Sequence, residues 1–404
     1  MSETLRYWQG ELAQAGIGIG TIVKCILAFL SFLSFVLTVW RWVAGADFPL
    51  HRRAAVRPPL PGCTVLKPLK GCDAETKTCL RSWLAQDYPG PAQFLFGVAS
   101  AEDPVCPVVR ELLAEFPQKD AQLVICAAAL GVNGKISTLR QLEPLIRHPL
   151  VVISDADVLA PADLLANLTP PLADPETGLV NCFYRLANPG NLAMRWEAIA
   201  INADFWSAVL QAQRLKKVDF ALGAVMALRA AQLREMGGFA PLADYLADDY
   251  QLGRQMARLG KRIVFSPVVV DCFEPRRNWA QAWAHQVRWA RTIRICQPVL
   301  FFFSVLDNAT FWPLLWLAVS RPALSDMDSP VLPACMLFIL FRVVTAFELE
   351  QRLTGSRAHF RYCWMAPVKD LLNLAVWVAA FTGNQIRWRG RNYRILPGGR
   401  LRSV

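Results

Sequence analysis

Residues 150–158 read LVVISDADV, an apolar run that ends in two aspartates. Stretches with helical character, such as residues 74–86 and 108–116, separate the similar runs that precede it. These earlier runs, rich in strand-forming residues, are TVLKPL (64–69), FLFGVAS (94–100) and LVICAAA (123–129). Short apolar strands that alternate with helices are typical of a parallel sheet buried on both faces. The sequence therefore predicts an α/β domain.

Polar residues stand near the ends of these predicted strands. Lys67 lies in the first run, and the second ends at Ser100, close to Asp103. The fourth run leads into Asp155 and Asp157. Ligands of parallel sheets bind at the carboxyl ends of the strands, so we expect these side chains to face one site.

A second acidic stretch, DYLADDYQL at residues 244–252, has three aspartates at the start of a predicted amphipathic helix: Asp244, Asp248 and Asp249. Neighbouring carboxylates repel each other, and such crowding suits the handling of a cation, a proton or a reacting hydroxyl. We hypothesise that the two acidic stretches meet in one site that handles a phosphorylated, metal-bound substrate.

The composition indicates a membrane protein. Of 404 residues, 54% are hydrophobic and only 19% are charged, more apolar than an ordinary soluble protein. Residues 22–40 are apolar except for Lys24, long enough to span a bilayer and too long for a removable signal peptide. Four arginines follow this segment: Arg41, Arg52, Arg53 and Arg57. The positive-inside rule then places the downstream domain in the cytoplasm, and we interpret the segment as a signal anchor.

Further membrane-associated segments are expected after the α/β domain. Residues 278–295 combine Trp and Arg on a predicted amphipathic helix, a pattern typical of the membrane surface. Apolar stretches follow at 298–319, 330–347 and 365–382. The third contains Lys369, Asp370 and Asn373, so a span, a re-entrant segment and an interfacial helix all stay open. An apolar stretch at 192–215 is interrupted by polar residues and is interpreted as a helix of the α/β domain.

Charge and cysteine content exclude other classes. The net charge is +11, but no zinc-finger spacing, RNP-like motif or basic helix accompanies it, so we expect anionic lipid and no nucleic acid as partner. The eleven cysteines form no CxxC pairs and are interpreted as reduced thiols. Only four histidines are present, which argues against a histidine-built metal site.

Motifs along most of the chain, from about Val65 onward, resemble the ceramide glucosyltransferase family of GT-A glycosyltransferases, which includes bacterial hopanoid glycosyltransferases. In order, they are LKPLKG (66–71), QDYP (86–89), ISDADV (153–158), FALGAVMALR (220–229), GGF (237–239), DYLADDYQLG (244–253), HQVRWAR (285–291) and WRGRNYR (388–394). The resemblance implies a Rossmann-like cytoplasmic GT-A domain between membrane segments. The expected units are a tail (1–21), a transmembrane anchor (22–43), a linker (44–62), the GT-A domain (63–276), an interfacial helix (277–297), transmembrane or re-entrant helices (298–385) and a basic tail (386–404).

The resemblance also implies roles for individual residues. Asp157 and Asp155 would hold Mg²⁺ or Mn²⁺, with Asp155 also near the donor sugar or ribose. Asp249, supported by Asp248, would be the general base that deprotonates the acceptor hydroxyl. Further contacts to the donor would come from Lys67, Ser100, Asp103, Lys135 and Arg288, and contacts to the acceptor from Trp289 and His285.

Two positions depart from the family pattern. Ser100 stands where the family has an aspartate for the uracil ring, and Asp103 could take over that contact. His285 stands where Gln or Arg begins the (Gln/Arg)-x-x-Arg-Trp motif.

The implied enzyme is an inverting, multi-pass glycosyltransferase of a bacterial inner membrane that moves glucose, or a related hexose, from a UDP-sugar to a lipid hydroxyl. Ceramide is the first choice of acceptor. The alternatives are a hopanoid acceptor with UDP-N-acetylglucosamine, a processive polysaccharide synthase, and a non-catalytic membrane scaffold of the same fold, which Ser100 favours.

Overall fold

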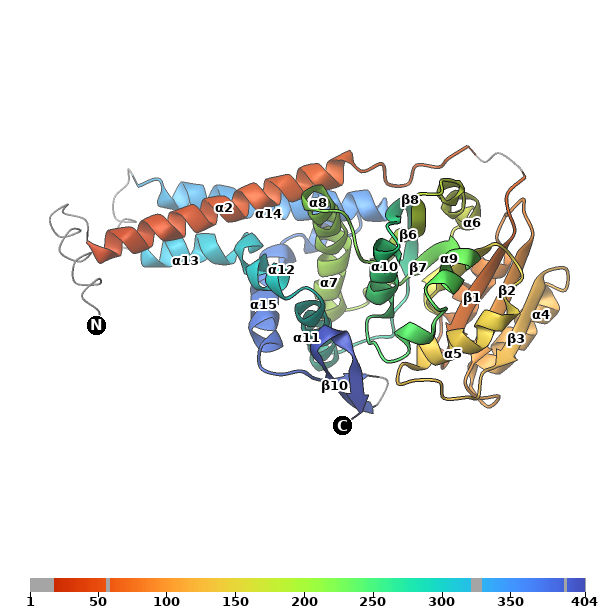
Figure 1. Ribbon diagram of the computed structural model, residues 1–404. Coiled ribbons are helices and arrows are strands. Elements are labelled where there is room, and N and C mark those ends of the chain that lie inside the picture. Colours follow the sequence, from red (N-terminus) through yellow and green to blue (C-terminus); the bar gives the residue numbers. More distant parts are fainter. Residues whose placement is uncertain (1–17, 56–58, 321–328, 389–390, 404) are drawn as a thin grey trace.

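The computed structural model describes residues 18–55, 59–320, 329–388 and 391–403. A mixed α/β domain forms one end of the molecule, and long helices extend from it at the other end (Figure 1). The strand order of the main sheet is β3-β2-β1-β4-β7-β6-β8-β5. Its strands are β1 (Cys63–Leu69), β2 (Ala92–Val98), β3 (Asp120–Ile125), β4 (Leu150–Ser154), β5 (Val158–Leu159), β6 (Thr177–Leu186), β7 (Val225–Arg229) and β8 (Arg262–Cys272).

The predicted α/β class is confirmed, and the four apolar runs form β1 to β4. These four strands are parallel, whereas β7 runs antiparallel to both β4 and β6. Strand β5 is also antiparallel to its neighbour β8, so the predicted parallel strands form one part of a mixed sheet. Successive side chains of a strand point to opposite faces of the sheet, and both faces are buried here. Val65 therefore packs into one core and Leu66 into the other.

Helices cover both faces of this sheet. The core that contains Val65 also contains residues of α3 (Thr76–Leu84), α4 (Val105–Glu115) and α6 (Leu164–Leu168). The core that contains Leu66 includes residues of α5 (Gly134–Leu142), α9 (Ala230–Glu235) and α10 (Asp248–Arg258). The carboxyl end of β4 and the amino ends of α5 and α10 thereby lie together at one edge of the main sheet.

Two helices are long and apolar enough to cross a membrane in the part of the chain that the structure describes: α2 (Ile19–Asp47) and α14 (Val331–Thr354). A third span is possible if a bent pair counts as one: residues 298–307, comprising α12 (Pro298–Phe303) and η5 (Ser304–Asp307), are followed by α13 (Phe311–Val319) at an angle of 54°. Helices α2, α13 and α14 lie side by side and project away from the sheet (Figure 1). The predicted stretch 298–319 is therefore a broken helix. The stretch at 365–382 corresponds to the shorter helix α15 (Met365–Ala380), whose 16 residues are fewer than the roughly 20 that a transmembrane helix needs.

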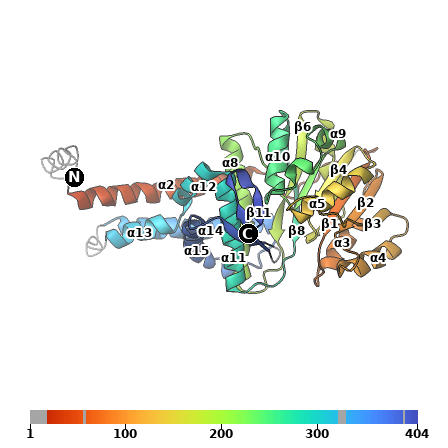
Figure 2. The same cartoon turned by 60° about the horizontal axis from the view of Figure 1, so that its bottom comes forward.

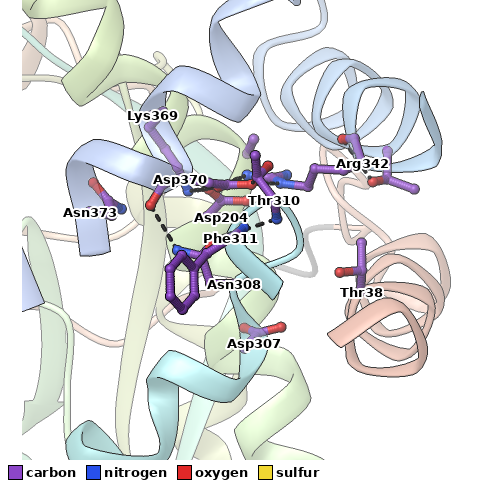
Figure 3. A network of polar contacts seen from close by, with 12 residues as sticks. Thr38, Asp204, Asp307, Asn308, Thr310, Phe311, Arg342, Lys369, Asp370 and Asn373 are labelled. Carbon is purple, nitrogen blue, oxygen red and sulfur yellow. Dashed lines mark hydrogen bonds and ion pairs between the residues drawn. The ribbon is translucent and has the colours of Figure 1, made fainter. Parts of the chain in front are cut away.

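A continuous helical segment links the sheet domain to the membrane helices. It consists of α7 (Leu192–Ile199), a π-helical turn (Ala200–Phe205) and α8 (Trp206–Leu215). The turn carries Asp204 into a buried polar network, in which Arg342 of α14 donates to Asp204 (2.8 Å) and to both oxygens of Asp370 (2.9 Å each) (Figure 3). Thr310, at the break before α13, also donates to Asp370 (2.8 Å).

The remaining elements close the molecule beside the sheet domain. Helix α11 (Trp279–Cys296) begins with a reciprocal capping box between Asn278 and Gln281. The region predicted to be a basic tail contains a small antiparallel sheet of β9 (Gln385–Trp388), β10 (Arg391–Ile395) and β11 (Leu401–Ser403). The turn Pro397–Gly399 of this sheet contacts α11, and Figure 2 shows β11 next to that helix.

Candidate active site

The turn after β4 carries Asp155 and Asp157 between two other strands. The backbone N–H of Asp155 donates to Ala224, just before β7 (3.2 Å). The carbonyl of Asp157 accepts from the N–H of Phe273, just after β8 (3.0 Å). Because β7 and β8 hold the turn from both sides, its two carboxylates have a fixed place at the edge of the sheet.

Lys135 joins this turn to the second acidic stretch. Its ammonium group lies 2.8 Å from Asp155 and 2.9 Å from Asp248. Asn133 caps α5 by accepting from the N–H of Lys135 (3.0 Å), and its amide donates to the carbonyl of Tyr245 (2.8 Å). The two acidic stretches therefore do meet, through one lysine at the start of α5.

The three crowded aspartates of residues 244–252 have three different environments. Asp244 accepts a hydrogen bond from the N–H of Val132 (3.1 Å), and its carbonyl accepts from Leu401 of the small sheet (2.7 Å). Asp248 is buried and paired with Lys135. Asp249 accepts from the N–H of Tyr250 (2.7 Å) and has no ion pair within the described residues. Asp244 thus ties its loop to the small sheet, and Asp249 is the one of the three carboxylates that neither pairs with Lys135 nor bonds to Val132.

Burial and charge shift the ionisation of these groups. Burial, followed by the neighbouring charge of Asp248, raises the pKa of Asp249 to about 7. Burial, followed by the charges of Asp155 and Glu274, raises the pKa of Asp157 to about 7. A carboxyl group with a pKa near neutrality can exchange a proton efficiently at physiological pH.

Gly223 faces the carboxylate of Asp249. A Cβ atom at this position would lie 2.9 Å from the Oδ2 atom of Asp249, closer than a side chain allows. The glycine therefore leaves room for this carboxylate.

Lys67 was predicted to contact the donor, and the structure places it beneath the turn that carries Asp155. Its side chain is fully buried, and its ammonium group donates to the hydroxyl of Ser154 (3.2 Å) and to the carbonyl of Asp155. It also lies over the ring of Trp83, 4.7 Å from the centroid. Burial lowers the pKa of Lys67 to about 8. Lys67 therefore supports the turn from beneath and has no exposed surface for a phosphate.

The two candidates after β2 differ from each other. Asp103 accepts from the N–H groups of Gly71 (3.0 and 3.2 Å to its two oxygens) and Val105 (3.0 Å), so its carboxylate ties the loop after β1 to the start of α4. Ser100 is exposed, and its hydroxyl accepts only from the N–H of Glu102 (3.2 Å) within the described residues. Of the two, Ser100 is the one free to meet a ligand.

The predicted acceptor residues line one face of α11. The rings of His285 and Trp289 have centroids 5.1 Å apart, and Trp289 lies 6.3 Å from Phe205 of the π-helical turn. Arg288 lies one turn after His285, close enough for its charge to contribute to the lowered pKa of that histidine. Tyr184 of β6 packs with Trp289 against a shared apolar cluster.

Glu197 of α7 is a further residue of this region that the sequence analysis missed. Its buried carboxylate lies 2.7 Å from the Nδ1 atom of His285. A lone glutamate inside an apolar stretch was the available signal, since a buried charge requires a partner.

The donor set suits a divalent cation that arrives with phosphates. No group of three or more His, Cys, Asp or Glu side chains placed to hold a metal occurs among the residues described. Mg²⁺ and Mn²⁺ in phosphate sites commonly need only one or two protein carboxylates, because phosphate oxygens and water complete the coordination. Asp155 and Asp157 supply this pair, and a cation between them would relieve the repulsion that contributes to the raised pKa of Asp157.

Comparisons with known proteins cover nearly the whole chain. Residues 23–401 match the model of glycosyl transferase family 21. Ceramide glucosyltransferase 1 of Caenorhabditis elegans is 22% identical over 406 residues, covering 95% of this chain and 80% of that protein. Ceramide glucosyltransferase 3 of the same organism is 21% identical, covering 94% of this chain and 82% of that protein.

A solved structure shares the fold. The mannosyltransferase PcManGT from Pyrobaculum calidifontis, solved with GDP-Man and Mn²⁺, superposes with a TM-score of 0.52. Its identity is 22%, and the match covers 87% of this chain and 99% of that one. The α/β domain is therefore a GT-A domain, and the protein belongs to glycosyl transferase family 21.

Proposed function

We propose that this protein is a membrane-bound, inverting glycosyltransferase that moves glucose, or a related hexose, from a UDP-sugar to the hydroxyl of a lipid, with ceramide as the first candidate acceptor. The observation that carries the proposal is the placement of Asp249. It is a carboxylate with a pKa near 7, held beside Asp248 and across Lys135 from the Asp155 turn. The relatives named as ceramide glucosyltransferases support the choice of acceptor.

Asp249 acts as the general base. It takes the proton of the lipid hydroxyl while the hydroxyl oxygen forms a bond to the anomeric carbon of the sugar. The bond from that carbon to the phosphate oxygen breaks on the opposite side, and UDP leaves with the electron pair. A single displacement with one base inverts the anomeric configuration, because no covalent sugar–enzyme intermediate forms.

The remaining polar residues bind and orient the donor. Asp155 and Asp157 would hold a divalent cation, which would supply positive charge to stabilise the leaving diphosphate. Lys135 orients the Asp155 carboxylate, and Arg288 adds positive charge toward the diphosphate. Ser100 offers its hydroxyl to the edge of the base.

The acceptor approaches from the membrane side. Helix α11, which carries Trp289 and His285, contacts both α7 and α15, and α2 and α14 hold the molecule in the bilayer. Arg41 near the end of α2, with Arg52 and Arg53 just after it, supports a cytoplasmic GT-A domain, as in a bacterial inner membrane. The proposal includes the assignment of residues 63–276 to the GT-A domain and of residues 277–297 to an interfacial helix.

Transfer by the purified full-length protein tests the proposal. The protein in lipid nanodiscs receives UDP-glucose with Mg²⁺ or Mn²⁺ and ceramide, and a parallel arm receives UDP-N-acetylglucosamine and a hopanoid. Mass spectrometry identifies the product, and NMR of the anomeric proton reports inversion. We expect a β-linked glycolipid from the α-linked donor, and no product from Asp249→Asn. Absence of sugar transfer to any lipid, with in-cell glycolipids unaffected by Asp249→Asn, would favour a non-catalytic scaffold.

A further inference from the structure

Glu197 lies at the centre of a hydrogen-bond cluster beside the acceptor face of α11. Only 1% of its side chain is exposed. The Oε1 atom contacts Nδ1 of His285 (2.7 Å) and accepts from the amide of Gln286 (3.2 Å). The Oε2 atom accepts from Arg277 (3.3 Å), which also binds Glu274 (2.5 Å). Both carboxylate oxygens therefore bond to side chains of α11 or of Arg277, just before this helix.

His285 uses only one of its two ring nitrogens. Nδ1 faces Glu197, and Nε2 makes no hydrogen bond within the described ranges. About 10% of the side chain is exposed, and the ring lies beside Trp289. The imidazole therefore has one nitrogen fixed by Glu197 and one without a hydrogen-bond partner among the described residues.

The surroundings define which nitrogen carries the proton. A carboxylate is acceptor-only, so the short contact requires an N–H on Nδ1. Burial lowers the pKa of His285, and the charges of Arg277 and Arg288 act in the same direction, while Glu197 opposes them. The ring is then neutral with a lone pair on Nε2, as in other histidines whose tautomer a carboxylate fixes.

We infer that Glu197 is a positioning residue that holds His285 as a hydrogen-bond acceptor for a donor group on the lipid headgroup, next to the hydroxyl that is glycosylated. This inference rests on the proposed function and specifies its substrate class: lipids with a second hydroxyl or an amide N–H beside the reactive hydroxyl. An arginine at this position would offer only donors, and a glutamine both donors and an acceptor. The histidine held by Glu197 offers an acceptor alone.

Two substitutions of Glu197 separate this role from a structural one. Glu197→Gln removes the charge that pairs with Arg277 but keeps an Oε1 atom that can accept from Nδ1–H. Glu197→Ala removes both. Glu350→Gln is the matched control, because Glu350 is a buried glutamate of α14 that does not contact His285.

The first readout is the tautomer and needs no turnover. The full-length protein labelled with ¹⁵N-histidine contains four histidines, and His285→Gln identifies the signal of His285. We expect a protonated Nδ1 and an unprotonated Nε2 in the wild type, in Glu197→Gln and in Glu350→Gln. Glu197→Ala is expected to show a tautomer mixture. A wild type with a protonated Nε2, or an unchanged signal in Glu197→Ala, overturns the inference.

The second readout is acceptor selectivity, measured as KM and kcat for ceramide and for analogues that lack the 3-hydroxyl or carry an N-methylated amide. At least one analogue should have a KM roughly 5- to 10-fold above that of ceramide in the wild type and in Glu197→Gln, the factor expected for one hydrogen bond. Glu197→Ala should raise the ceramide KM to the analogue value with kcat changed less than twofold. Equal losses in Glu197→Gln and Glu197→Ala would show a structural role and overturn the inference. A fixed tautomer in a protein that glycosylates no lipid would overturn the proposed function instead.

Discussion

Lys135 and Asp155 form an ion pair of 2.8 Å between the start of α5 and the turn after β4. The same ammonium group lies 2.9 Å from Asp248, so a single positive charge separates the acidic turn from the helix that carries the proposed base. The ion pair makes the two acidic stretches one electrostatic unit.

Loss of the Lys135 charge should therefore affect both donor binding and the base. We expect Lys135→Gln to lower kcat/KM about 10- to 100-fold at pH 7, the range for a hydrogen bond to a charged group. The Lys135 charge also lowers the pKa of Asp249, so the pH profile of kcat should move to higher pH. Lys216→Gln removes an exposed lysine and should leave both quantities unchanged. A profile that does not move would contradict the coupling of Lys135 to Asp249.

The proposed base gives the enzyme a pH dependence around neutrality. Because burial and Asp248 raise the pKa of Asp249 to about 7, kcat should increase with pH through about 7 as the carboxyl loses its proton. The profile is measured with saturating donor, metal and lipid. A flat profile between pH 5.5 and 8 would argue against Asp249 as the base.

The same group should make the native state less stable as the pH rises. The ordinary pKa of 3.8 applies to Asp249 in the unfolded chain, so between about pH 4 and 7 the native state binds the extra proton. The free energy of unfolding then decreases with pH in this window. Asp249→Asn removes this dependence while keeping an Oδ1 acceptor for Tyr250. Its Tm should match or exceed that of the wild type at pH 8, although transfer falls at least 1,000-fold, and Asp219→Asn should change neither.

Gly223 gives a test of the space around the base. In Gly223→Ala the new methyl group would lie 2.9 Å from Asp249, whose other oxygen is held by the N–H of Tyr250. The carboxylate must shift, and small misplacements of a catalytic group can cost up to about 100-fold in rate. We expect kcat to fall roughly 10- to 100-fold with little change in Tm. Gly20→Ala, which meets no atom within 4 Å, is the control.

The buried network of Figure 3 should dominate the stability of the membrane region. Arg342→Met removes the guanidinium that bonds to Asp204 and Asp370 and leaves Lys369 as the cation that pairs with both. Breaking a buried pair costs up to about 3–5 kcal/mol. Thermal unfolding in nanodiscs should show a correspondingly lower Tm. Arg352→Met, on the same helix but in a half-exposed pair with Glu348, should cost no more than about 1 kcal/mol. Equal effects of the two changes would contradict the role given to the network.

Much of the fold could be predicted because burial leaves a clear pattern. The apolar run before Asp155 is a strand buried on both faces, and its neighbours have the same composition. The direction of β7 could not be read in this way, since a parallel and an antiparallel strand at the same depth have the same composition. The break before α13 did have a signal that was not used: Asn308 and Pro313 interrupt the apolar stretch, and both disfavour a continuous helix there.

The site was predicted unevenly for a related reason. Clustered acidic residues in a motif predict a polar site, and the structure does bring Asp155 and Asp248 together through Lys135. Whether a lysine faces solvent or lies beneath a turn depends on the fold, so the buried position of Lys67 could not be predicted from its motif. Glu197 belongs to no quoted motif, and its importance follows only from the partners that α11 brings to it.

The small sheet of β9 to β11 sets an order of events during biosynthesis. Its residues bond to Asp244 and Leu246, immediately before the proposed base, yet they are translated after α14 and α15. The GT-A domain therefore emerges from the ribosome long before the segment that bonds to the loop before the proposed base. The loop before the proposed base can therefore take its final contacts only after α14 and α15 have been translated.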